Sequence, residues 1–193
     1  YAFSAILETS RDCPFGCAFC DWGQLKSKTR RFSMERVLRE IDWFADHKIC
    51  YIWGGDANFG TYKEDAEIAR YLVETKTAKG YPQLFNMNYS KTNVDGVFEI
   101  NRLLHAAKMS RGVPLSFQSL LPEVLDNIHR RNMDLESFSR LIAMYNEAGV
   151  PMYSELIIGL PGETYESFCR GIGILFESGQ HKTLNVYNYE LLC

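Results

Sequence analysis

The chain has 193 residues, of which 46% are hydrophobic and 13% aromatic, enough for one compact domain with a sizeable buried core. Its formal net charge of −3 gives no electrostatic footprint for nucleic acid. No apolar run approaches the roughly 18 residues that a membrane span needs, and no signal segment opens the chain. The sequence starts at Tyr1 inside an apolar, strand-like stretch, so we interpret residues 1–193 as one domain, a fragment of a longer protein.

Short β-rich runs alternate with helical patterns along the chain. Six strands are predicted, in chain order, at Ser4–Thr9, Ile49–Trp53, Leu84–Tyr89, Pro114–Ser119, Met152–Ile158 and Leu184–Glu190. Helical periodicity follows the cap residue Ser33 and recurs at Ala66–Lys79, Val97–Ala107, Pro122–Ile128, Phe138–Ala148 and Tyr165–Glu177. Three helices are followed by glycines typical of C-terminal caps: Gly80, Gly149 and Gly179.

This alternation of strand and helix predicts an α/β fold with a parallel sheet and right-handed crossovers. The order alone leaves two architectures open, an open doubly wound sheet and a partial barrel. In both of them the active face lies at the C-terminal ends of the strands. Polar and glycine-containing motifs follow the first, second, fourth and fifth predicted strands, so the sequence predicts a catalytic site at that end.

Six cysteines could form disulfides in a secreted protein, but their distribution points to a metal instead. Three of them fall within eight residues, and clustering of this kind indicates metal binding in a reducing compartment such as the cytoplasm. The other three lie in apolar segments, where we interpret them as small buried hydrophobic residues. They are Cys50, Cys169 and Cys193.

The clustered cysteines directly follow the first predicted strand. Cys13, Cys17 and Cys20 have the spacing C-x3-C-x2-C, and Pro14 and Gly16 supply the turns that a short loop needs to wrap a metal centre. Three thiolates fill three corners of a cubane iron–sulfur cluster and leave one iron open to a ligand. A structural zinc site and a fortuitous, unliganded group of cysteines are the alternatives, and a zinc site normally requires a fourth protein ligand.

The cysteine spacing, with the aromatic Phe19 just before the last cysteine, resembles the signature of the radical S-adenosylmethionine superfamily. The resemblance implies a partial (β/α)6 TIM-like barrel of parallel strands. It implies a [4Fe–4S] cluster on Cys13, Cys17 and Cys20, whose open iron is chelated by the amino and carboxylate groups of S-adenosylmethionine. One electron from a reductant such as flavodoxin or ferredoxin then cleaves the cofactor to methionine and a 5′-deoxyadenosyl radical. Phe19 and the backbone near Trp22 are expected to lie against the adenine.

Two later segments resemble other parts of the family pattern. Gly54-Gly55-Asp56 is similar to the Gly-Gly-Glu motif that receives the methionine amino group, with Asp in place of Glu; a plain glycine turn is the alternative. Ser116 and Gln118 share one face of the fourth predicted strand by alternation, where the family has its ribose and carboxylate contacts.

Three further residues are assigned to the cofactor by the same resemblance. Arg130 matches an arginine that reaches the methionine carboxylate; a solvated cation at a helix end is the alternative. Ile157, in the fifth predicted strand, matches an apolar residue that packs on adenine. Glu155 occupies a position where members of the family frequently have a small residue. A carboxylate in the middle of a strand requires a partner. It is interpreted as a ligand contact or as a salt-bridged barrel residue.

The longer run 8–23, together with residues 30–32, 56–60 and 80–82, resembles the cobalamin-binding subgroup of this superfamily. The resemblance implies a B12-binding domain upstream, and methyl transfer to an unreactive carbon or phosphorus of a small-molecule or peptide substrate. Two alternatives stay open. One is a radical enzyme without cobalamin, such as a methylthiotransferase or an oxidative decarboxylase, and the other is a non-enzymatic iron–sulfur or zinc module.

Overall fold

The computed structural model describes residues 3–23 and 28–190. The chain divides into two compact units, the first comprising Tyr1–Pro14 and Ser27–Gly112 and the second Phe15–Lys26 and Val113–Cys193. Each unit combines a parallel sheet with helices. The alternation of elements predicts one parallel sheet, whereas the described residues form two parallel sheets of three strands. Among the described residues, no helix is both long and apolar enough to cross a bilayer.

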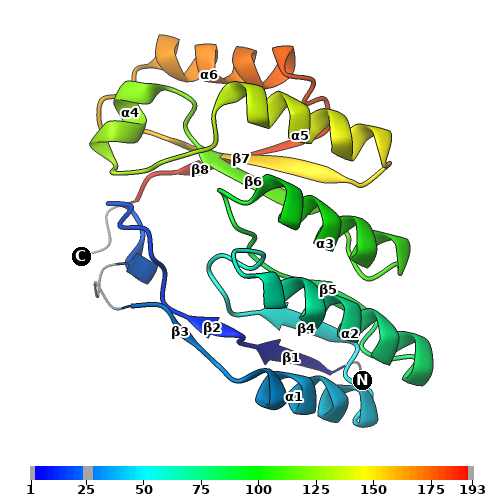
Figure 1. The fold of residues 1–193 in the computed structure, drawn as a ribbon. Helices are drawn as coiled ribbons and strands as arrows, with labels where there is room; N and C mark the ends of the chain where they lie inside the picture. The colour runs from blue at the N-terminus through cyan, green and yellow to red at the C-terminus, as the bar shows by residue number, and fades with distance from the viewer. Residues whose placement is uncertain (1–2, 24–27, 191–193) are drawn as a thin grey trace. The chain divides into compact units, whose positions relative to one another are not determined.

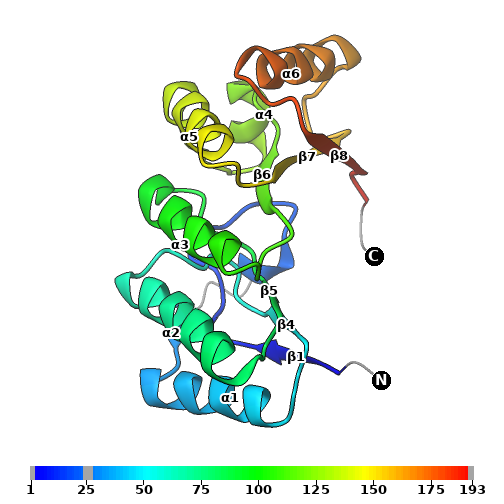
Figure 2. The same cartoon turned by 90° about the vertical axis from the view of Figure 1, so that its right-hand side faces the viewer.

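The first unit is built on a parallel sheet in the order β1–β4–β5. Its strands are β1 (Ser4–Leu7), β4 (Tyr51–Gly54) and β5 (Leu84–Asn86), and its helices are α1 (Met34–Asp46), α2 (Lys63–Lys79) and α3 (Val94–Ala106). The three helices lie along one side of the sheet (Figures 1 and 2). Ile52 and Phe85 are paired across two strands and are 0% and 2% exposed, whereas the neighbouring Trp53 is 46% exposed. Because successive strand residues point to opposite faces, the core lies between sheet and helices.

The second unit repeats this plan with a parallel sheet in the order β6–β7–β8. Its strands are β6 (Val113–Gln118), β7 (Met152–Ile158) and β8 (Thr183–Asn188), and its helices are α4 (Pro122–Asn127), α5 (Leu135–Glu147) and α6 (Tyr165–Glu177). Leu115 and Phe117 are buried on one face of β6, and the alternating residues Pro114, Ser116 and Gln118 are half-buried. The half-buried face of this sheet carries the predicted cofactor residues of β6 and β7.

Local signals place several helix ends where the sequence predicts them. The hydroxyl of Ser33 accepts a hydrogen bond from the amide of Arg36 and caps α1. Gly80 follows α2 with a φ of 79°, a left-handed conformation that glycine adopts without strain. By contrast, α2 begins at Lys63 rather than Ala66, because a polar first turn precedes the apolar periodicity.

A short antiparallel pair at the start of the cysteine segment was not predicted. β2 (Ser10–Arg11) pairs with β3 (Arg30–Arg31), and the two are separated by the segment that contains the clustered cysteines. Strands of two residues carry no periodicity that a sequence pattern could reveal. The pairing therefore defines the entry and the exit of this segment in the fold.

Candidate functional site

The entry to the cysteine segment is fixed by an unusual backbone conformation and an ion pair. Asp12, which directly precedes Cys13, has a φ of 74°, in the left-handed region that is uncommon for a residue other than glycine. Its carboxylate accepts a hydrogen bond from Arg30 Nε at 3.2 Å and lies 3.1 Å from a second guanidinium nitrogen. Because Arg30 lies on β3, this ion pair ties the turn before Cys13 to the β2–β3 pair.

Asp56 is buried and accepts three hydrogen bonds from the chain before the cysteines. Its Oδ1 accepts from the backbone amide of Thr9 at 2.7 Å, and its Oδ2 accepts from the hydroxyls of Thr9 at 2.6 Å and Ser10 at 2.7 Å. Burial raises the pKa of Asp56, and the hydrogen bonds from Thr9 and Ser10 act in the opposite direction. Gly54-Gly55-Asp56 is the segment predicted to receive the methionine amino group. Through Asp56 it also anchors the part of the chain that leads to Cys13.

Gly54 and Gly55 differ in how much space their surroundings leave for a side chain. A Cβ atom on Gly54 would lie 1.8 Å from the sulfur of the buried Met87, so a larger residue at this position would require the Met87 side chain to move. A Cβ atom on Gly55 would meet Ile6 at 3.4 Å, close to ordinary contact. Packing against Met87 therefore explains why position 54 is a glycine. Position 55 has room for a Cβ atom beside its backbone.

Asn58 contacts one of the clustered cysteines and was not predicted as a site residue. Its Nδ2 donates a hydrogen bond to the sulfur of Cys13 at 3.1 Å. The side chain is buried, and its Oδ1 has no hydrogen-bond partner among the described residues. No local pattern connects Asn58 to Cys13, because 45 positions separate them in the sequence.

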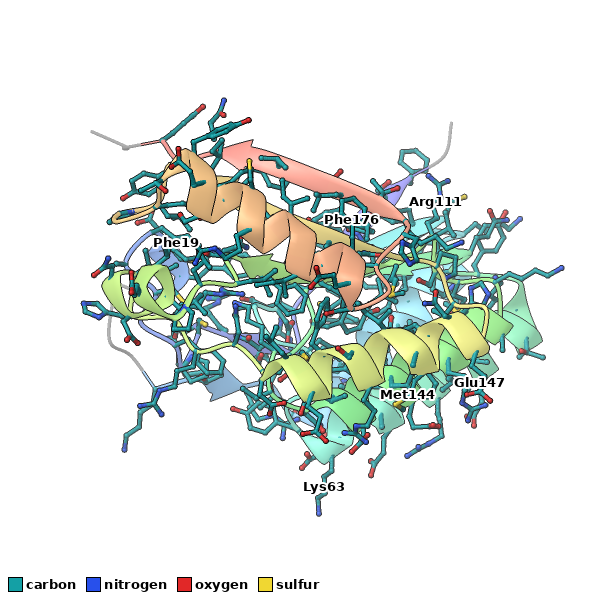
Figure 3. All side chains as sticks on the ribbon, turned by 90° about the horizontal axis from the view of Figure 1, so that it is seen from above. Phe19, Lys63, Arg111, Met144, Glu147 and Phe176 are labelled. Atoms are coloured by element: carbon teal, nitrogen blue, oxygen red, sulfur yellow. The ribbon has the colours of Figure 1, made fainter. Side chains whose placement is uncertain are left out.

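The second half of the cysteine segment belongs to the second unit. The amide of Ala18 donates to the carbonyl of Ile128 at 2.9 Å, and Cys17 is buried. Phe19 packs against a core cluster formed by Val124, Ile128 and Leu160, and Ile157 packs against the same cluster. Figure 3 shows Phe19 beside α4. The two side chains predicted to contact adenine thus share one apolar surface.

Trp22, the third residue assigned to the adenine, lies in the short 3₁₀ helix Asp21–Gly23. Its side chain is 48% exposed. The prediction that the backbone near this residue contacts adenine stays a prediction.

Arg130 is buried beside the cysteine segment. Only 4% of it is exposed, so the alternative of a solvated helix-end cation is wrong. One guanidinium nitrogen lies 3.9 Å from the sulfur of Cys17, and the guanidinium carbon lies 5.9 Å from the centre of the Phe19 ring. The side chain also donates to the carbonyl of Ser116 and, from Nε, to Asn132 Oδ1 at 2.8 Å. A positive charge is therefore held next to a predicted cluster ligand.

Ser116 and Glu155 are neighbours across β6 and β7. They are paired in register, and the hydroxyl of Ser116 donates to Glu155 Oε2 at 2.5 Å. Glu155 is half-buried, and no ion pair to it is found among residues 3–23 and 28–190. The carboxylate is therefore held by a hydroxyl, and the alternative of a salt-bridged residue finds no support in the described part of the chain.

Gln118 ends β6 in a strained conformation. Its φ is 66°, and the register of β6 against β7 shifts between Ser116 and Gln118. Its buried Oε1 has no hydrogen-bond partner in the part of the chain that the structure describes. Strained backbone and unsatisfied buried polar atoms are both typical of ligand-binding positions.

The described cysteines are free thiols. Cys13, Cys17, Cys20, Cys50 and Cys169 form no disulfide; Cys193 lies outside the described residues. Cys169 is exposed and Cys50 is half-buried, so the prediction that both are buried is wrong. Within the described ranges, no three His, Cys, Asp or Glu side chains are arranged to hold a single metal ion. That finding concerns mononuclear sites, whereas a cubane takes one thiolate at each of three irons.

Comparisons with known proteins agree with the resemblance of these motifs. The sequence model of the Radical SAM superfamily matches residues 7–170. A 2-(S-pantetheinyl)-carbapenam-3-carboxylate methyltransferase of Streptantibioticus cattleyicolor is 44% identical over 191 residues. The cobalamin-dependent radical SAM methyltransferase TokK of Streptomyces tokunonensis is 42% identical over 191 residues. Each alignment covers 98% of this chain and 28% of the relative, so the chain spans under a third of either protein.

Solved structures show the same fold. The structure of the radical S-adenosylmethionine methyltransferase TsrM from Kitasatospora setae, with tryptophan and a cofactor analogue bound, has a TM-score of 0.76 and 20% identity. The match covers 95% of this chain and 36% of TsrM. A second TsrM structure, with cobalamin and a [4Fe–4S] cluster bound, has a TM-score of 0.75 and 21% identity, and covers 96% and 34%. These neighbours confirm the predicted fold class, an α/β partial barrel of parallel strands.

Proposed function

Because the chain belongs to the radical SAM superfamily, we propose that it is the catalytic core of a cobalamin-dependent methyltransferase. The substrate is an unreactive carbon or phosphorus centre of a small molecule or peptide. One observation carries the proposal: two relatives with 44% and 42% identity, aligned over 98% of the chain, are both named methyltransferases, and one is named cobalamin-dependent.

Cys13, Cys17 and Cys20 would hold the [4Fe–4S] cluster. Two of the three sulfurs have a nitrogen donor nearby, Asn58 at 3.1 Å from Cys13 and Arg130 at 3.9 Å from Cys17. Donors and positive charge of this kind suit thiolates that share the negative charge of an iron–sulfur centre. The residues present therefore fit the group. When bound, the cluster supplies the electron that cleaves the S–C5′ bond of S-adenosylmethionine.

The remaining predicted residues would bind and orient S-adenosylmethionine. Phe19, Ile157 and the backbone near Trp22 would take the adenine, since Phe19 and Ile157 share one apolar cluster. Ser116 and Gln118 would meet the ribose or carboxylate groups, and Glu155 would be a further ligand contact. The buried Oε1 of Gln118, which has no partner among the described residues, is available to a donor such as a ribose hydroxyl. Arg130 would pair with the methionine carboxylate, and Gly54-Gly55-Asp56 would face the amino group.

The full-length protein would contain more than this core. We propose that residues 1–193 form the radical SAM domain and that a cobalamin-binding domain precedes it. A one-electron donor such as flavodoxin or ferredoxin would reduce the cluster. The free thiols of the described cysteines suit the reducing conditions of the cytoplasm. The negative net charge gives no reason to expect a nucleic-acid substrate.

Product analysis with methyl-labelled S-adenosylmethionine tests the proposal. Full-length protein, reconstituted anaerobically with iron, sulfide and cobalamin, would be incubated with a reductant and with the S-pantetheinyl carbapenam named for the relative. We expect a labelled methyl group on carbon, formation of 5′-deoxyadenosine, and loss of both in Cys17→Ala. Transfer of the label together with sulfur would indicate a methylthiotransferase and contradict the proposal. Full activity without cobalamin would also contradict it.

A further inference from the structure

Asn58 is held rigidly in the loop that follows β4. Its carbonyl oxygen accepts the hydroxyl of Thr61 at 2.7 Å. The next residue, Phe59, donates its amide to Asn88 at 2.9 Å and accepts from the amide of Ser90 at 2.8 Å, which ties the loop to the chain after β5. Asp56, two residues earlier, is bound to Thr9 and Ser10. With its backbone fixed on both sides and its side chain 7% exposed, Asn58 has a preorganised amide.

The two ends of this amide have different surroundings. Nδ2 donates to the sulfur of Cys13 at 3.1 Å. This orientation suits Cys13 as a cluster ligand, because a carbonyl oxygen would repel the sulfur of a metal-bound thiolate. Oδ1 is buried and has no partner among residues 3–23 and 28–190. Buried carbonyl oxygens nearly always accept a hydrogen bond, and leaving one unsatisfied is costly. The Oδ1 atom is therefore an acceptor that is available to a hydrogen-bond donor of a bound ligand.

The neighbouring carboxylate of Asp56 already serves a structural contact. Both oxygens of Asp56 accept hydrogen bonds from Thr9 and Ser10, with three donors in total. The α-amino group of S-adenosylmethionine carries N–H donors and, by the proposed function, binds the cluster to which Cys13 contributes a ligand. An amide that touches the Cys13 sulfur lies beside that cluster, and its free oxygen is an acceptor of the right chemistry for the amino group.

Resting on the proposed function, we propose that Asn58 links the cluster to its cofactor. Its N–H fixes the Cys13 sulfur and raises the midpoint potential of the cluster, because a donor to a ligand sulfur stabilises the more negative, reduced form. Its Oδ1 accepts a hydrogen bond from the α-amino group of S-adenosylmethionine. Asn58 is thus a positioning residue for Cys13 and a binding residue for the cofactor, while Asp56 anchors the strand before the cysteines.

Two substitutions in the full-length, anaerobically reconstituted protein separate the two roles. Asn58→Leu has nearly the same size and loses both donor and acceptor. In this variant the ratio of reduced to oxidised cluster at a fixed potential should fall about fivefold, as expected for one hydrogen bond of ordinary strength. Its affinity for S-adenosylmethionine should fall by a similar factor of about five. Asn58→Asp keeps acceptor oxygens but loses the donor, so its potential should fall while its affinity is retained.

The readouts are a redox titration followed by electron paramagnetic resonance and a binding titration with S-adenosylmethionine, neither of which depends on turnover. Asn146→Leu and Asn146→Asp, on the exposed surface of α5, are the matched controls and should change neither quantity. An Asn58→Leu variant with normal iron content and unchanged potential and affinity overturns the inference, whatever the aspartate variant does. Wild-type protein that assembles no cluster overturns both this inference and the proposed function.

Discussion

Asp56 and Thr9 are joined twice, once through the backbone amide of Thr9 at 2.7 Å and once through its hydroxyl at 2.6 Å. The two residues are 47 positions apart, and the pair connects the loop after β4 to the chain that leads into the cysteines. A buried carboxylate that accepts from three donors is a strong connection. Its removal would leave each donor without an acceptor, and every unsatisfied buried donor costs free energy. The position of Cys13 therefore depends on residues outside its own segment.

Asp56→Ala should destabilise the fold and reduce cluster assembly. The substitution leaves the Thr9 amide and the Thr9 and Ser10 hydroxyls without their acceptor, at a cost of about 3 kcal/mol in the free energy of unfolding. Urea unfolding and iron content after anaerobic reconstitution measure the two effects. Asp46→Ala removes an exposed carboxylate of α1 that pairs with Lys79, and it should leave both quantities unchanged. Equal unfolding free energies and iron contents for the two variants would show that Asp56 does not anchor the chain before the cysteines.

The contribution of Asp56 to stability should depend on pH in a defined direction. Burial raises its pKa above the ordinary value of 3.8. Because the folded state then binds the proton more tightly, the contribution is fully present below the unfolded pKa and is lost as pH rises through the folded pKa. In urea unfolding of cluster-free protein, the advantage of wild type over the neutral variant Asp56→Asn should shrink as pH rises from about 4 to 7. An advantage that grows over this range would mean that the pKa is lowered instead.

Arg130→Met should weaken both the fold and the binding of S-adenosylmethionine. Methionine keeps much of the side-chain volume but loses the hydrogen bonds to Ser116 and Asn132 and the charge beside Cys17. The loss in unfolding free energy should be about 3 kcal/mol, as for other buried, hydrogen-bonded charges. The neighbouring Arg131 is exposed, so Arg131→Met should change the unfolding free energy by less than about 0.5 kcal/mol. Similar losses in both variants would contradict the buried role of Arg130.

Ser116 and Glu155 should be energetically coupled. A double-mutant cycle with Ser116→Ala and Glu155→Ala, followed by urea unfolding, should give a coupling energy of about 2 kcal/mol, typical of a hydrogen bond to a charged group. Coupling within experimental error of zero would mean that the carboxylate does not depend on this hydroxyl. The Glu155 carboxylate would then be available to another partner on the half-buried face of the sheet.

Periodicity and turn chemistry were enough to predict the elements of the fold. The bounds of β7 and α6 agree with the prediction, and Ser33 and Gly80 cap their helices as expected. Other bounds differ by one to three residues: β5 ends at Asn86 rather than Tyr89, and α2 and α3 each begin three residues before the predicted start. The two-residue strands β2 and β3 were not predicted at all. In those places the tertiary partners determine the conformation.

The site was predictable only where its residues are adjacent in sequence or carry a pattern. The cysteine spacing and the alternation of Ser116 and Gln118 are local signals, and the cofactor roles assigned to them remain predictions. The partners of Asp56 and Cys13 were not predictable, because each contact joins residues more than 40 positions apart. Asparagines such as Asn58 are common in loops, and only the folded chain shows which of them meets a sulfur atom.

The central claim is that Cys13, Cys17 and Cys20 hold a four-iron cluster with one iron open to S-adenosylmethionine. Mössbauer spectroscopy of the anaerobically purified, full-length protein, enriched in a suitable iron isotope, tests it most directly. We predict that adding S-adenosylmethionine changes the spectrum of one iron site and leaves the others unchanged, and that Cys17→Ala carries no such cluster. Zinc in place of iron, or a cluster whose spectrum does not respond to the cofactor, would contradict the account.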